Sequence, residues 1–243
     1  NGSGNEGFHA EQTKDGGFIF SGERHEEVGG TSDVFLVRTD RNGQLLWSRT
    51  YGDVENEYGF AVKELEDGSF AIGGFTESYG AGARDFYLMK LDTEGDTLWT
   101  GTYGGTSLDL ANDLLVTDDN GFLLAGYSFS FGAGNSDALI IKTDASGNIE
   151  WQFAYGGPDN DLVHDITPSA DGGYVLVGET ESFGSAGSDL YIIRIDRNGQ
   201  LLWSRTLGGE LSEFGNAIIQ TNDGGYVIAG STESFGAMGI DAY

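Results

Sequence analysis

The sequence contains no cysteine, only two prolines and only 12 basic residues among 243. Without cysteine there is no disulfide framework and no thiolate metal site. The 39 acidic residues give a formal net charge of −27, which repels nucleic-acid phosphates and anionic membranes. No apolar run approaches the ~20 residues that span a bilayer. We therefore expect no nucleic-acid partner and no membrane insertion, and a solvated acidic surface explains the charge best.

A strict repeat runs through the chain. Its tryptophans lie 52 residues apart, at Trp47, Trp99, Trp151 and Trp203. Turn sequences of the Asp-Gly-Gly-Phe type keep the same period and begin at Asp15, Asp67, Asp119, Asp171 and Asp223. A period of this length indicates a repeat architecture. Residues that all copies share are therefore predicted to be architectural, and specificity is expected where one copy departs from the others.

Each repeat predicts four short strands, which we call a to d. In the best-defined copies they cover residues 214–220, 226–230, 189–196 and 201–206, and a hairpin turn with Gly199 joins strands c and d. A meander of this size cannot bury both of its faces alone, whereas copies stacked around an axis can. We predict an all-β fold, a β-propeller of four-stranded antiparallel blades, with the tryptophans packed between blades. It forms one domain over residues 1–243, with repeat units at about 7–57, 58–109, 110–161, 162–213 and 214–243, the last one incomplete.

The stretch from Asp137 to Trp151, followed by Tyr155-Gly156-Gly157, carries a family resemblance. It resembles the β-propeller repeats of secreted and cell-surface proteins of bacteria and archaea, and more distantly the quinoprotein-type propeller. The pattern recurs along the whole chain. The resemblance implies a propeller fold and an extracellular or cell-surface location, but it does not fix an activity, because one fold serves many functions.

The long loops define the predicted binding face. The a–b and c–d turns are short and uniform, whereas the b–c and d–a loops are long and variable and share the opposite face of a propeller. Four b–c loops carry an aromatic ring, at Tyr79, Phe131, Phe183 and Phe235. These rings are candidate stacking platforms for a glycan. The alternative, which we favour, is that each ring wedges between blades and holds its loop.

Repeat one departs from this pattern. Its b–c loop contains His25, Glu26 and Glu27 in place of the aromatic ring. The substitution makes one sector of the binding face acidic and hydrophilic, so these residues are candidates for a partner or metal contact. Tolerated surface variation is the simpler alternative.

Acidic residues form a further column just before strand a, at Glu57, Asp109, Asp161 and Glu213. A ring of carboxylates near the axis of a propeller would attract Ca²⁺, and we expect no other cofactor. The alternative, which we favour, is that these side chains cap backbone N–H groups of the loops. A local ion pair is also predicted between Arg38 and Asp40, which share one face of strand c, and at the equivalent pairs in later repeats.

The sequence offers little for catalysis. The three histidines, His9, His25 and His164, occupy different columns of the repeat, so no Ser–His–Asp set is indicated. Asp113 and Asp165 replace alanines of strand a and come nearest to a catalytic carboxylate pair.

We therefore predict a non-catalytic scaffold or binding module with a protein or glycan ligand on the b–c and d–a loop face. One alternative is a structural subunit of a surface assembly or filament. The last repeat stops at Tyr243 within strand c, which fits a longer propeller, a ring with a short last blade, or a blade that strand exchange with a partner completes. The third account predicts self-association. The other alternative function is a polysaccharide-acting hydrolase or lyase.

Overall fold

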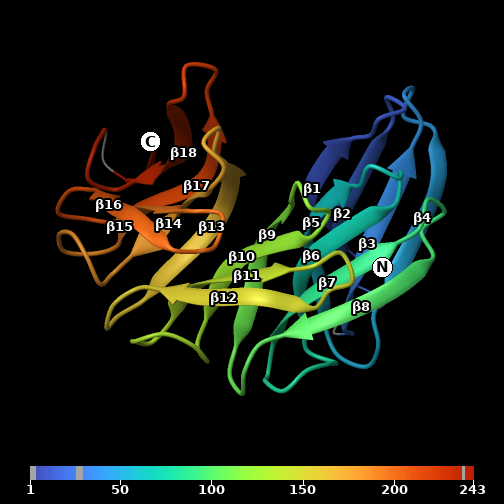
Figure 1. Cartoon of the computed structure of the whole chain (residues 1–243), viewed down its shortest axis with the longest axis horizontal. Helices are drawn as coiled ribbons and strands as arrows, with labels where there is room; N and C mark the ends of the chain where they lie inside the picture. The colour runs from blue at the N-terminus through green and yellow to red at the C-terminus, as the bar shows by residue number, and fades with distance from the viewer. Residues whose placement is uncertain (1–3, 26–29, 237–238) are drawn as a thin grey trace. The chain divides into compact units, whose positions relative to one another are not determined.

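A computed structural model describes residues 4–25, 30–236 and 239–243 of the chain. These residues form five antiparallel sheets, in which strands that follow one another in sequence also lie side by side (Figure 1). Four sheets have four strands and the fifth has three. The prediction of an all-β propeller with four-stranded antiparallel blades and a shorter last blade is confirmed.

The strands are 7 or 8 residues long in every blade, except that the last strand has two residues. Blade 1 contains β1 (Asn5–Gln12), β2 (Phe18–His25), β3 (Ser32–Thr39) and β4 (Leu45–Tyr51). Blade 2 contains β5 (Glu57–Glu64), β6 (Phe70–Thr76), β7 (Asp85–Leu91) and β8 (Thr97–Tyr103). Blade 3 contains β9 (Asp109–Val116), β10 (Phe122–Ser128), β11 (Asp137–Thr143) and β12 (Ile149–Tyr155). Blade 4 contains β13 (Asp161–Pro168), β14 (Tyr174–Thr180), β15 (Asp189–Ile195) and β16 (Leu201–Leu207), and blade 5 contains β17 (Glu213–Gln220), β18 (Tyr226–Thr232) and β19 (Asp241–Ala242).

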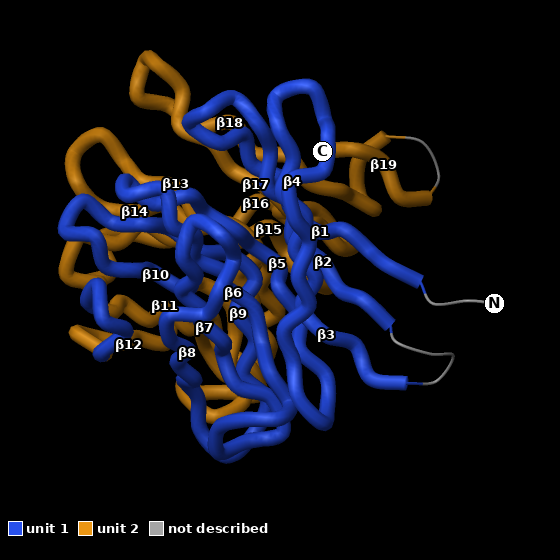
Figure 2. The backbone as a smooth tube through the Cα atoms, turned by 90° about the vertical axis from the view of Figure 1, so that its right-hand side faces the viewer, with its two compact units in different colours: residues 1–124, 144–148 blue, residues 125–143, 149–243 orange. Residues whose placement is uncertain are grey.

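The chain divides into two compact units, which Figure 2 shows in different colours. Unit 1 comprises residues 1–124 and 144–148, and unit 2 comprises residues 125–143 and 149–243. The boundary falls within β10. The assignment of residues 1–243 to a single domain stays a prediction.

Apolar side chains form the core between consecutive blades. We call the side of a blade that meets the next blade in sequence its forward face, and the opposite side its rear face. In unit 1, Ile19, Val34 and Leu36 of blade 1 form one cluster with residues of blade 2 that include Ile72 and Met89. In unit 2, the forward face of blade 4 and the rear face of blade 5 form the equivalent cluster from Val175, Val177, Leu190, Ile192, Ile218, Tyr226 and Ile228. Both faces of an interior blade are apolar because both are covered.

The tryptophan column belongs to this packing, as predicted. The ring of Trp47 packs on the cluster between blades 1 and 2 and touches Gly95, the glycine of the c–d hairpin in blade 2. Gly95 has φ +84°, and a Cβ there would lie 3.2 Å from the ring. Tyr51, four residues after the tryptophan, donates its hydroxyl hydrogen to the Gly95 carbonyl at 2.7 Å. The same Trp–Tyr–Gly contact, which we call the interblade lock, recurs at Tyr103–Gly147 at 2.7 Å and Tyr155–Gly199 at 2.5 Å.

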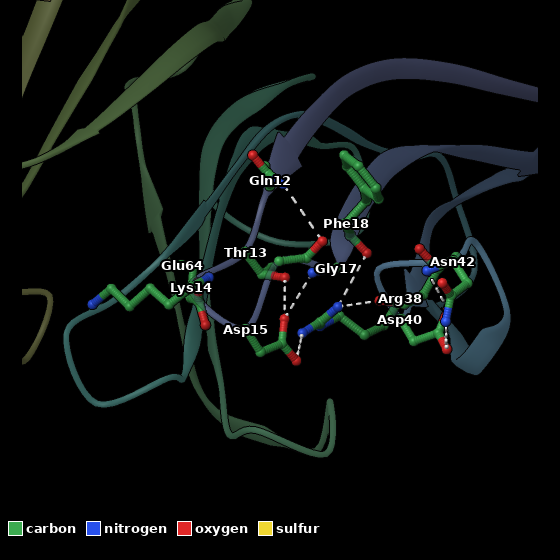
Figure 3. Close-up of polar contacts among 12 residues, drawn as sticks. Gln12, Thr13, Lys14, Asp15, Gly17, Phe18, Arg38, Asp40, Asn42 and Glu64 are labelled. Carbon is green, nitrogen blue, oxygen red and sulfur yellow. Dashed lines mark hydrogen bonds and ion pairs between the residues drawn. The ribbon is translucent and has the colours of Figure 1, made fainter.

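A basic residue of strand c forms an ion pair with the Asp-Gly-Gly-Phe turn. The predicted ion pair between Arg38 and Asp40 is therefore wrong. Arg38 makes an ion pair of 2.7 Å with Asp15 of the a–b turn, not with Asp40 (Figure 3). Asp40 instead accepts the backbone N–H groups of Asn42 and Gln44, each at 2.8 Å. In blade 4, Arg194 likewise pairs with Asp171. Arg38 is buried, so its guanidinium turns inward to the turn and away from the solvent-exposed hairpin.

Candidate functional site

The predicted stacking rings lie on the b–c loops and are partly open to solvent. Three of them are 42–46% exposed, namely Tyr79, Phe183 and Phe235, and Phe131 is half-buried. Each of the three exposed rings packs on a tyrosine two residues after the first residue of strand c. The ring centroids lie 6.2 Å apart for Tyr79–Tyr87, 5.8 Å for Phe183–Tyr191 and 5.7 Å for Phe235–Tyr243. This backing fixes the orientation of each ring and leaves part of its surface open.

The tip of each ring contacts the d–a loop that precedes its blade. Tyr79 donates its hydroxyl hydrogen to Asp53 at 3.0 Å. In unit 2, a Cβ on Gly157 would lie 3.1 Å from Cζ of Phe183, and a Cβ on Gly209 would lie 3.4 Å from Cζ of Phe235. The rings thus hold two loops together, which is the contact expected of loop-holding residues. Their role in binding stays a prediction.

The acidic column before strand a is completely buried. Glu57 accepts the hydroxyl of Thr76 at 2.7 Å and the backbone N–H of Asp53 at 3.0 Å. Glu213 makes the equivalent contacts with Thr232 and with the N–H of Gly209, each at 2.7 Å. Asp109 and Asp161 accept the N–H of Gly105 and Gly157, each at 2.7 Å. Each carboxylate therefore accepts a backbone N–H group of the d–a loop, as the capping alternative predicts, and joins strand a to that loop.

The structure places a second buried acid beside this column. The aspartates that open strand c, such as Asp137, lie against the glycine that directly follows strand d. A Cβ on Gly156 would lie 2.1 Å from Oδ1 of Asp137 and 2.6 Å from Oδ2 of Asp161. Burial raises the pKa of Asp137, and the neighbouring Asp161 raises it further, while backbone N–H groups of Gly134 and Ala133 oppose the shift. The same arrangement joins Asp85 to Asp109 beside Gly104, with the pKa of Asp85 raised for the same reasons.

No metal centre emerges from these acids. Among residues 4–25, 30–236 and 239–243, no group of three or more histidine, aspartate or glutamate side chains could hold a metal ion. The binding of Ca²⁺ by Glu57, Asp109, Asp161 and Glu213 stays a prediction.

The departing loop of repeat one contributes to a polar network in unit 1. His25 lies 3.2 Å from Glu23 through Nε2 and 2.8 Å from the Ser32 hydroxyl through Nδ1. Tyr58 of blade 2 joins the network: burial raises its pKa, a hydrogen bond with Ser32 lowers it, and the Glu23 carboxylate raises it. Glu26 and Glu27, also predicted to contact a partner, lie outside the described residues.

The chemistry of this network is hydrogen bonding. Glu23, His25 and Ser32 are arranged in the order of an acid–base–nucleophile set, but Ser32 is only 1% exposed and so is closed to a substrate. Ser136 and Ser188 stand at the repeat position of Ser32, and Glu179 stands at that of Glu23. Because these side chains recur, they looked architectural, and nothing in the sequence connected them to His25. The sequence feature that pointed to the network was His25, which lies in a loop that carries an aromatic ring in the other repeats.

The inner-strand aspartates have backbone partners. Asp165 accepts the N–H of Ile166 at 2.8 Å and the N–H of Ile218, in the next blade, at 2.6 Å. Ile218 follows a register shift between Gly215 and Ala217, where strand a bulges. In unit 1, Nδ1 of His9 accepts a hydrogen bond of 3.4 Å from the backbone N–H of Val62. Val62 follows the equivalent bulge of β5, between Gly59 and Ala61. Residues of this column therefore join strand a of one blade to the bulge of the next.

One further carboxyl group has an unusual environment. Glu179, near the end of β14, is largely buried, and its Oε2 has no hydrogen-bond partner among the described residues. Burial and the neighbouring Glu181 carboxylate raise the pKa of Glu179 to about 7. The nearby strand-a histidine, His164, has its pKa lowered by burial. Glu179 is thus a proton-binding group close to neutral pH.

The sheets, the buried caps and the interblade lock together define a β-propeller repeat protein. Comparison with known proteins narrows the class. The chain belongs to the family described as outer membrane protein assembly factor BamB, whose sequence pattern matches residues 32–240. This match confirms the quinoprotein-like resemblance of the repeats.

A curated relative is the regulatory protein FlaEY of Caulobacter vibrioides, which is 30% identical over 183 residues. The match covers 65% of this chain but only 19% of the relative. The chain is therefore similar to a small part of a much longer protein.

Solved structures share the fold at low sequence identity. A D477G ACO/RPE65 chimera matches 95% of this chain and 57% of its own, with a TM-score of 0.54 and 12% identity. A puromycin hydrolase matches 95% of this chain and 36% of its own, with a TM-score of 0.52 and 15% identity. A glucose dehydrogenase matches 91% of this chain and 77% of its own, with a TM-score of 0.50 and 12% identity. At such identities the likeness concerns the fold alone. The described residues include no helix long and apolar enough to cross a membrane.

Proposed function

We propose that the chain is a non-catalytic β-propeller scaffold that acts outside the cytoplasm and binds a glycan at its b–c and d–a loops. The observation that carries the proposal is the set of half-exposed rings Tyr79, Phe183 and Phe235, each backed by a tyrosine. A ring whose orientation is already fixed loses little conformational entropy when a ligand stacks on it.

Carboxylates beside the rings favour a sugar, rather than an apolar peptide, as the ligand. Tyr79 is hydrogen bonded to Asp53, and its loop also contains Glu77, which holds Arg84 at 2.7 Å. In unit 2, Glu181 precedes the Phe183 loop and accepts the side-chain N–H of Asn160 at 2.6 Å. An aromatic ring with hydrogen-bonding groups at its edge suits the apolar face and the hydroxyl groups of a sugar. Because the net charge is −27, we expect a neutral or cationic glycan.

The comparisons support a binding role without fixing the ligand. The curated relative is named as a regulatory protein, and regulation needs recognition but no chemistry on a substrate. The polysaccharide hydrolase or lyase alternative requires an open carboxylate pair. The best-defined inner acid, Asp165, is occupied by backbone N–H groups, which disfavours that alternative.

A glycan array tests the proposal. Wild type should bind a restricted set of neutral or cationic glycans, and a variant with Tyr79→Ser, Phe183→Ser and Phe235→Ser should lose at least tenfold in affinity. Leu45→Ser, which removes an exposed side chain of the outer strand, is the matched control and should bind as wild type does. An array without bound glycans, or equal binding by the triple variant, refutes the proposal. Capture of a protein ligand through the same rings would replace the glycan with a protein partner.

A further inference from the structure

The b–c loop of blade 2 contains a carboxylate together with its own counter-ion. Arg84 donates its Nε hydrogen to Oε1 of Glu77 at 2.7 Å, and its guanidinium carbon lies 4.6 Å from the ring centroid of Phe75. The other carboxylate oxygen of Glu77 accepts the side-chain N–H of Asn56 at 2.6 Å. We call the space beside residues 75 and 77 that the guanidinium fills, and its equivalent in each other blade, the loop site.

Blade 4 has the same loop without the arginine. Glu181 repeats the contact of its blade 2 equivalent, since its Oε2 accepts the side-chain N–H of Asn160 at 2.6 Å. The repeat position of the arginine is occupied by Ser188, and that of the phenylalanine by Glu179. The loop site of blade 4 thus has a second carboxylate where blade 2 has a ring, and a neutral hydroxyl where blade 2 has a guanidinium.

The carboxyl group of Glu179 has no basic partner. Its Oε2 is buried and accepts no hydrogen bond from residues 4–25, 30–236 and 239–243. Burial and Glu181 raise its pKa, with no cation of the described chain opposing them, and the nearby His164 has its pKa lowered by burial alone. Blade 1, which also has a glutamate at this position, supplies a partner, since His25 lies 3.2 Å from Oε1 of Glu23. A basic side chain therefore meets a carboxylate of the loop site in blades 1 and 2, and none of the described residues does so in blade 4.

The loop site of blade 4 lies close to an exposed aromatic ring. Phe183, in the same b–c loop as Glu181, is 42% exposed and packs on Tyr191. One d–a loop contacts both side chains: a Cβ on Gly157 would lie 3.1 Å from Cζ of Phe183, and Asn160 is hydrogen bonded to Glu181. The Cα atoms of residues 157 and 160 are at most ~11 Å apart, because only three residues of chain separate them. A short oligosaccharide that stacks on the ring therefore reaches the carboxylates with a neighbouring sugar.

We propose that the loop site of blade 4 binds the ammonium group of an amino sugar, in the place that Arg84 fills in blade 2. The inference rests on the proposed function, because the sugar is the ligand that stacks on Phe183. An ammonium group supplies the positive charge that Glu179 and Glu181 lack, and it donates charge-assisted hydrogen bonds to their oxygens. Acetylation of the amino group removes that charge, so the free amino sugar should bind more tightly than its acetylated form.

Calorimetric titration of the whole chain with glucosamine oligomers, and with N-acetylglucosamine oligomers of the same length, tests the proposal. Wild type should bind the amine form roughly tenfold more tightly. Glu181→Gln removes one carboxylate, and Ser188→Arg places the guanidinium of blade 2 in the site, so each should lower this ratio about fivefold. Glu94→Gln removes the same charge from the exposed c–d hairpin of blade 2 and should keep the wild-type ratio. Equal affinities of wild type for the two oligomers, or a wild-type ratio in Glu181→Gln, overturn the proposal, and the second criterion holds even if circular dichroism shows that Ser188→Arg does not fold.

A titration without glycan separates this inference from the proposed function. Ethylammonium chloride, added to the chain with ¹³C-labelled glutamate carboxyl groups, should shift the resonances of Glu179 and Glu181 more than NaCl at the same concentration does, and that of Glu94 equally. These shifts in a chain that binds no glycan would refute the proposed function and leave the cation site standing. Identical shifts with both salts overturn the cation site, whichever glycan binds. A lysine peptide that binds more tightly than the amine oligomer, and loses this affinity in Glu181→Gln, would overturn the amino sugar in favour of a basic peptide.

Discussion

Single residues of this chain show how neighbouring charges and burial change the pKa of a carboxyl group. Asp15 lies beside the Arg38 guanidinium, which lowers the pKa of its carboxyl group. Glu179 has no cation beside it, and its pKa is raised to about 7 by burial and by Glu181. The difference is set by neighbours that the linear sequence does not reveal, since Arg38 and Asp15 lie 23 residues apart.

Glu179→Gln should change how stability depends on pH. The pKa of Glu179 is about 7 in the folded chain, against an ordinary value of 4.5 for a glutamate. The folded state therefore binds this proton more tightly, and stability falls as pH rises through that interval. The glutamine variant lacks this ionisation, so it should gain roughly 1–3 kcal/mol over wild type at pH 8 and show a flatter profile.

Urea unfolding at a series of pH values measures this effect. Glu233→Gln, an exposed glutamate of the blade 5 loop, is the control and should keep the wild-type slope. A Glu179→Gln profile parallel to that of wild type would contradict the raised pKa.

Gly156→Ala should destabilise the chain strongly. The new Cβ would lie 2.1 Å from Asp137 and 2.6 Å from Asp161, which are both buried and held by backbone N–H groups. Either carboxylate must leave its donors, so we expect a loss of at least ~2 kcal/mol in the free energy of unfolding. Gly7→Ala is the matched control, because its Cβ would meet nothing within 4 Å. Equal melting temperatures for the two variants would refute the role of this glycine.

At the scale of elements, each blade is stabilised by its contact with the c–d hairpin of the next blade in sequence. The interblade lock joins strand d of one blade to the c–d hairpin of the following blade, as at Tyr51–Gly95 and Tyr103–Gly147. Burial raises the pKa of Tyr103 to about 12, so its hydroxyl remains a hydrogen-bond donor at any ordinary pH. Blade 4 has Leu207 at this position and cannot make the bond.

Tyr103→Phe should therefore cost about 0.5–1.5 kcal/mol, the net worth of one intramolecular hydrogen bond. Tyr79→Phe also removes one hydroxyl, but its partner Asp53 is exposed and can bind water instead. We expect Tyr79→Phe to stay within ~0.5 kcal/mol of wild type. Calorimetric melting of both variants compares them, and a larger loss for Tyr79→Phe would contradict the structural role of the lock.

The sequence predicted most of the elements and few of their contacts. The 52-residue period and the turn chemistry were enough to place four strands per repeat, because both are local or periodic signals. The pairing of Arg38 with Asp15 was missed, since it depends on the register between strand c and the a–b turn. The network of Glu23, His25, Ser32 and Tyr58 was missed because it crosses from one blade to the next. Such contacts arise only when particular copies become neighbours.

At the scale of the whole molecule, charge is the dominant property. The chain has 39 acidic and 12 basic residues, so the like charges of the folded chain repel one another. Salt screens this repulsion. NaCl should therefore raise the melting temperature. CaCl₂ at the same ionic strength separates screening from binding: an equal rise indicates screening alone, whereas a further rise that EDTA reverses would support Ca²⁺ at Glu57, Asp109, Asp161 and Glu213.

The most direct test of the proposed binding face is hydrogen–deuterium exchange with and without the tightest-binding glycan from the array. The binding face predicts new protection in the b–c loops at residues 77–84, 129–136, 181–188 and 233–236, and in the d–a loops that touch them. The a–b turns at residues 13–17, 65–69, 117–121, 169–173 and 221–225 should be unchanged. Protection confined to the a–b turns or to the outer strands would contradict the claim that the aromatic loops form the binding surface.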